Sequence, residues 1–158
     1  MSNLRKRHIY IPAIAGILTP SLVIFILEVF VGNIPPLRSV QSILKRQFAE
    51  GENLFEIMLI GLIPFAVLIV INIAKSRIMP VPKLDFLAFG GLIGILLFMV
   101  FGHVAVWYPM YGGGHMSSTA VIAFFFIPVF CIVAMGIGMF LSLAICRLIF
   151  GKNRRQDD

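Results

Sequence analysis

Charged residues are scarce in this chain of 158 residues. Asp, Glu, Lys and Arg together make up 13% of it, whereas about a quarter of a soluble domain is charged. Once the long apolar stretches are set aside, only short segments remain, and a domain core needs roughly 50 residues or more. The composition therefore excludes a separate soluble domain within these residues.

Cysteine is scarce as well, because the sequence holds only Cys131 and Cys146. On one helix, with a rise of about 1.5 Å per residue, they would be roughly 22 Å apart. A disulfide needs Cα atoms within about 7 Å of each other, so these two cannot pair. Tight metal-binding spacings such as H-x-x-x-H are missing too. We therefore expect no metal and no cofactor.

The chain does contain four long apolar runs, over about residues 9–31, 55–74, 86–107 and 118–150. Each run has at least about 20 residues, the length that an α-helix needs to cross a bilayer core. We predict an all-α, polytopic membrane protein with a single four-helix transmembrane domain over residues 1–158. The lipid bilayer is then its first partner.

Basic residues flank the apolar runs and account for the net charge of +6. Because Lys and Arg concentrate in cytoplasmic segments, their distribution predicts orientation rather than binding to nucleic acid. Both termini are predicted to lie in the cytoplasm, with a bacterial plasma (inner) membrane as the default location. Ten basic residues adjoin the cytoplasmic ends of the runs, namely Arg5, Lys6, Arg7, Lys75, Arg77, Lys83, Arg147, Lys152, Arg154 and Arg155. Three lie in the first outer loop, namely Arg38, Lys45 and Arg46.

The first outer loop has a helical pattern of its own. Five apolar residues recur at helical spacing after Pro35-Pro36, namely Leu37, Val40, Ile43, Leu44 and Phe48. Proline at the first helical position is typical of a helix start. We predict a short amphipathic helix on the outer membrane surface. Docking on the protein's own helices, or on a partner, is equally compatible with the pattern.

Small residues form a periodic pattern in the third and fourth runs. Such residues let helix backbones approach closely in lipid. We expect the two seams to pack against each other within one chain, and a homo-oligomer interface is the alternative. The small residues are Gly90, Gly94 and Gly102 in the third run and Ala134, Gly138 and Ser142 in the fourth.

Ionisable residues stand near the outer ends of the runs, where hydrocarbon disfavours them. They are Glu28, Glu56 and His103, and His115 lies in the third loop. Threading four spans through the membrane places all four residues at one leaflet, so we predict a polar cluster there. Such a cluster could relay protons, bind a divalent metal or join helices as a polar knot, and intramembrane ionisable residues are functional candidates by default.

The leading hypothesis is a non-enzymatic membrane protein that binds another protein in or just outside the membrane. In size and layout the chain resembles the membrane immunity proteins that protect bacteria from pore-forming toxins, and that resemblance implies an immunity or accessory-subunit role. The predicted partner-binding residues are the loop residues Leu37, Val40, Leu44 and Phe48 and the interfacial aromatic residues Trp107, Tyr108 and Tyr111.

Two other functions are compatible with the sequence. A small transporter or a proton- or ion-conducting subunit would use Glu28, Glu56 and His103, and internal prolines can break transporter helices at substrate depth. An interfacial membrane enzyme would use His115 as its acid–base group together with the nearby carboxylates. Ser117 and Ser118 lie close to His115, but they are not part of a nucleophile-elbow motif. The sequence therefore predicts no catalytic residue.

Overall fold

A computed structural model describes residues 3–48, 54–113 and 120–151. The regular secondary structure of these residues is entirely helical. The elements are α1 (Asn3–Phe30), α2 (Pro36–Arg46), α3 (Leu54–Gly61), α4 (Ile63–Lys75), α5 (Val81–Tyr111) and α6 (Ala120–Gly151).

Four helical segments are long and apolar enough to cross a membrane, which confirms the predicted fold class at this level. They cover Lys6–Phe30, Leu54–Lys75, Val81–Tyr111 and Ile122–Ile149. The second segment is interrupted at Leu62, between α3 and α4. Pro64 in the first turn of α4 has no N–H to donate, so the helix breaks just before it. The other three helices continue through their prolines.

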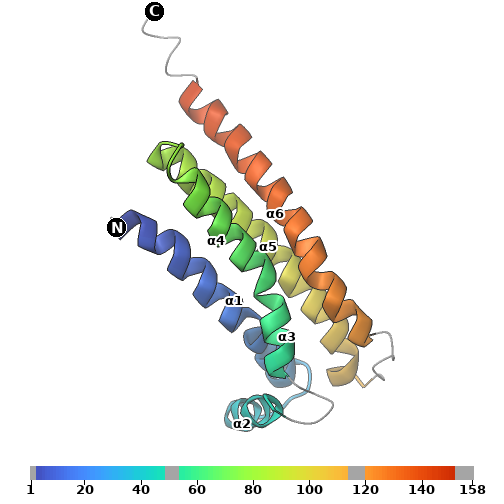
Figure 1. Ribbon diagram of the computed structural model, residues 1–158. Coiled ribbons are helices and arrows are strands. Elements are labelled where there is room, and N and C mark those ends of the chain that lie inside the picture. Colours follow the sequence, from blue (N-terminus) through green and yellow to red (C-terminus); the bar gives the residue numbers. More distant parts are fainter. Residues whose placement is uncertain (1–2, 49–53, 114–119, 152–158) are drawn as a thin grey trace, which may run out of the picture.

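The long helices run alongside one another, and α2 lies across one end of the bundle (Figure 1). We call this end the α2 end. The start of α1 and the end of α6 lie at the opposite end, which we call the terminal end. Helix α5 is central, because it packs on α1, α4 and α6.

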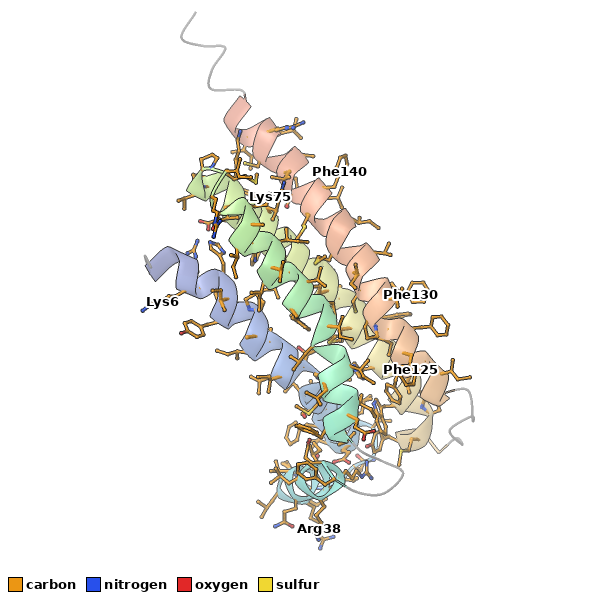
Figure 2. All side chains as sticks on the ribbon, in the orientation of Figure 1. Lys6, Arg38, Lys75, Phe125, Phe130 and Phe140 are labelled. Carbon is orange, nitrogen blue, oxygen red and sulfur yellow. The ribbon has the colours of Figure 1, made fainter. Side chains whose placement is uncertain are left out.

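Helix α6 is peripheral. Only 17% of the most apolar stretch of α6 is buried, and Figure 2 shows Phe140 pointing from α6 away from the other helices. In a membrane this surface faces lipid, which is as apolar as the side chains themselves. The contacts that hold α6 come mainly from α5.

The small residues form the seam between α5 and α6. A Cβ atom added at Gly94 would collide with the backbone carbonyl oxygen of Ala134, and one at Gly90 would collide with that of Gly138 and with Ser142. At Gly102 it would meet the side chain of Ile127. The two backbones are therefore in direct contact within one chain, as small residues permit.

Candidate functional site

Glu28 occupies the last turn of α1 and is fully buried, with 0% of its surface exposed. The chain then reverses at Asn33, which adopts a positive φ of 52°, a conformation that asparagine tolerates better than most residues. The N–H of Ile34 donates to the Glu28 carbonyl oxygen at 2.9 Å. This turn brings α2 back over the end of α1, so that its side chains reach the Glu28 carboxylate.

Among the described residues, four side chains surround the Glu28 carboxylate. The Ser39 hydroxyl donates to Oε2 at 2.5 Å, and the Ser42 hydroxyl donates to Oε1 at 3.3 Å. Tyr111, at the end of α5, donates its hydroxyl to Oε1 at 3.1 Å. Arg46 Nη1 lies 3.4 Å from Oε1 and donates to the Tyr111 oxygen at 2.8 Å. We call these five residues the Glu28 network.

The Glu28 network joins three helices. An isolated carboxylate is strongly disfavoured away from water, and here a cation and three hydroxyl donors compensate for its burial. Because removal of one partner from a buried ion pair leaves an uncompensated charge, such pairs resist separation. The network therefore fixes α2 and the end of α5 to α1.

One face of α2 contacts the bundle and the opposite face does not. Ser39 and Ile43 are buried against the bundle. Of the five apolar residues in the predicted pattern, Ile43 thus faces the bundle. The other four lie on the opposite side, where their exposed fractions run from 45% at Val40 to 76% at Phe48. We call Leu37, Val40, Leu44 and Phe48 the α2 stripe. The helix thus docks through the face that carries its serines, and its stripe stays exposed.

Two further residues show how α2 and the segment after it lie relative to the bundle. Figure 2 shows Arg38 at the extreme end of the molecule, pointing away from the helices. The Phe48 ring, just after α2, packs against Phe55 of α3 with ring centroids 5.4 Å apart. This contact ties the far end of the stripe to the start of the second membrane segment.

The three aromatic residues predicted at the membrane interface all lie on α5, and each has a different environment. Trp107 is buried, and its ring lies 5.6 Å from that of Phe124 on α6. Tyr111 belongs to the Glu28 network, whereas Tyr108 is exposed. Trp107 is therefore not exposed for contact with a partner, because its position on α5 turns it toward α6. Tyr108 remains available at the surface.

The structure places the residues of the predicted polar cluster in different surroundings. The Glu28 carboxylate lies in the Glu28 network. His103 is buried beside the ring of Phe124, and its Nδ1 has no hydrogen-bond partner in the described part of the chain. Glu56 is exposed at the start of α3, and His115 lies outside the described residues. No group of three potential metal ligands occurs among the residues described.

A second polar cluster, not anticipated from the sequence, lies at the terminal end. Arg7 Nη2 is 2.5 Å from Asp85 Oδ2, and His8 Nε2 is 3.0 Å from Asp85 Oδ1. Asn72 of α4 donates to the His8 carbonyl oxygen at 3.4 Å. We call Arg7, His8 and Asp85 the Asp85 cluster. It connects α1 to α5 near their first turns.

Comparisons with protein-family models, with curated proteins and with solved structures find no match to this chain. The two polar clusters and the surfaces beside them are therefore the basis for any functional conclusion. The α2 end combines a fixed helix with exposed apolar side chains, whereas the terminal end combines basic residues with a partly open ion pair.

Proposed function

We propose that this chain is a non-enzymatic integral membrane protein that binds a partner protein through its α2 end. The single observation that carries the proposal is the arrangement of α2. The Glu28 network holds the helix in one orientation, while the α2 stripe on its opposite face remains exposed. The basic flanks favour an orientation with both termini in the cytoplasm. In a bacterium, this surface then lies at the outer face of the plasma membrane.

The fixed orientation of α2 supports binding to a protein. An amphipathic helix needs no buried carboxylate to rest on lipid, because its apolar face and basic residues suffice. A helix already held in its binding orientation loses less conformational entropy when a partner docks. The exposed Tyr108 on α5 extends the surface with an aromatic side chain of the kind that is enriched at interfaces.

The geometry favours this function over transport. A proton or ion pathway along the predicted residues requires Glu28 and His103 to act together, but they have separate surroundings. Glu28 is bound by hydroxyl groups and Arg46, and His103 packs against Phe124. Accessory-subunit and toxin-immunity roles both use a partner-binding surface, and both fall within the proposal.

Site-specific photocrosslinking in intact membranes tests the proposal. A photoreactive amino acid at Val40, in the α2 stripe, is expected to form one discrete protein adduct. The same probe at Phe140, on the lipid-facing side of α6, is expected to form lipid adducts only. Leu44→Asp should abolish the Val40 adduct, because a carboxylate in the stripe opposes apolar docking.

The matched control is Arg38→Asp, which places the same carboxylate on α2 at a position outside the α2 stripe. It should leave the Val40 adduct in place. Lipid adducts alone at Val40, or equal loss of the protein adduct in both variants, would contradict the proposal.

A further inference from the structure

A pocket of about 280 Å³ opens between α1 and α5 at the terminal end. It has a polar part, formed by the Asp85 cluster, and an apolar part. The apolar lining residues are Ile11, Pro12, Ala88, Phe89 and Leu92.

Arg7 gives the pocket a group that can bind an anion. Its side chain is 48% exposed, and the contact with Asp85 involves Nη2. A guanidinium carries five N–H donors in a planar fork that matches the oxygens of a phosphate. Asp85 positions the Arg7 guanidinium at the pocket through one carboxylate oxygen. The buried His8 lies beside the other oxygen of Asp85.

The charge around the pocket favours an anion over a cation. Asp85 is the one acidic residue described at the terminal end, and the basic residues outnumber it. Basic pockets between transmembrane helices bind the head groups of anionic lipids. The basic residues described at this end are Lys6, Arg7, Lys75, Arg77, Lys83 and Arg147.

The apolar lining identifies the anion as part of a lipid. Ile11 follows Arg7 by one helical turn on α1, and Phe89 follows Asp85 by one turn on α5. The pocket therefore changes from polar to apolar over about 6 Å of depth along both helices. A free phosphate would use only the polar part, whereas a phospholipid would also place its glycerol and first acyl carbons against the apolar side chains.

We infer that this pocket binds an anionic phospholipid of the surrounding bilayer, with Arg7 on the phosphate, Asp85 as the residue that positions Arg7, and Ile11, Phe89 and Leu92 against the apolar part. The small side chain of Ala88 leaves the space that the lipid occupies. The inference goes beyond partner binding and does not depend on the α2 end, so either can fail without the other.

Native mass spectrometry of the full chain, released from nanodiscs of mixed phosphatidylglycerol and phosphatidylcholine, tests the inference. The protein is expected to retain phosphatidylglycerol in preference to phosphatidylcholine. Arg7→Gln should lower this preference about tenfold, the effect of losing a charge-assisted hydrogen bond. Arg7→Lys should lower it less, because the charge remains and the planar fork is lost.

The control is Lys6→Gln, which removes one positive charge next to Arg7 but outside the pocket lining. It should keep the preference. Ala88→Leu, which fills the pocket, should abolish retention of the lipid in protein that stays folded by circular dichroism. Equal losses in Lys6→Gln and Arg7→Gln would overturn the inference, and so would displacement of the lipid by millimolar inorganic phosphate.

Discussion

The two ends of this bundle use similar groups for different purposes. At each end a carboxylate and an arginine connect α1 to a neighbouring helix. Glu28 is 0% exposed and has four partners, whereas the Asp85 side chain is 33% exposed and lies beside a pocket. The degree of burial makes the difference. A carboxylate removed from water must be fully compensated and then holds helices together, whereas a partly hydrated one contributes little stability and leaves its arginine able to bind something else.

The largest effect is expected from Glu28→Ala, which tests whether the α2 end is held by its buried carboxylate. Removing one member of a buried ion pair costs about 3–5 kcal/mol. The loss should be near the lower value because Arg46 retains some access to water. Hydrogen exchange in detergent should show α2 amides losing protection.

The matched change at the terminal end, Asp85→Ala, should leave α2 protection as it is. Unchanged protection of α2 in Glu28→Ala would show that the stripe or the α3 contact, rather than the carboxylate, holds the helix.

A somewhat smaller effect is expected from Gly94→Leu, which acts on both ends through the helix they share. The added side chain meets the Ala134 backbone, which cannot move aside as a side chain can. Overpacking of this kind costs about 1–3 kcal/mol, so thermal unfolding in detergent should begin at a lower temperature. Gly136→Leu is the control, because a Cβ atom at Gly136 has open space around it. Equal loss of stability in the two variants would contradict a close α5–α6 seam.

Tyr111→Phe should have a moderate effect that is confined to the α2 end. It removes the hydroxyl that donates to Glu28 and accepts from Arg46, and one such hydrogen bond contributes about 1 kcal/mol. Exchange of α2 amides should accelerate roughly fivefold, as this energy implies. The exposed Tyr108 provides the comparison, since Tyr108→Phe should leave the exchange rate unchanged.

The smallest effect is expected from Asp85→Asn, within about 1 kcal/mol because the ion pair is partly exposed. The difference in melting temperature between wild type and variant should shrink further in about 1 M salt, where screening acts within about 3 Å. A large destabilisation that resists salt would mean that the Asp85 cluster holds the helices as firmly as the Glu28 network does.

The sequence was sufficient to predict where most features lie along the bundle. Run length and hydropathy located the four membrane segments, and the prolines and the helical pattern located α2 between the first two. Glu28 was singled out because an acid in an apolar run is exceptional. What it binds was not predicted, although Ser39, Ser42 and Arg46 recur at helical spacing on the face opposite the stripe.

Direction around each helix axis was harder to predict than position along it. Glu28 and His103 both occur near the predicted outer ends of their runs, but helix packing turns one toward α2 and the other toward α6. Tyr111 lies 83 residues from Glu28 in the chain, and no local pattern connects the two. Asp85 was overlooked because it adjoins the basic flank of the third run, and its pairing with Arg7 depends on how α1 packs on α5.

The spacing of the two clusters along α1 has a consequence for the membrane itself. Arg7 and Glu28 are 21 residues apart on this helix, which corresponds to about 32 Å at about 1.5 Å per residue. The hydrocarbon core of a typical bilayer is about 30 Å thick. The two clusters therefore lie level with the two head-group layers at the same time only when the bilayer thickness matches this length. In a thinner bilayer the bundle must tilt, and mismatch of this kind sorts proteins among membranes.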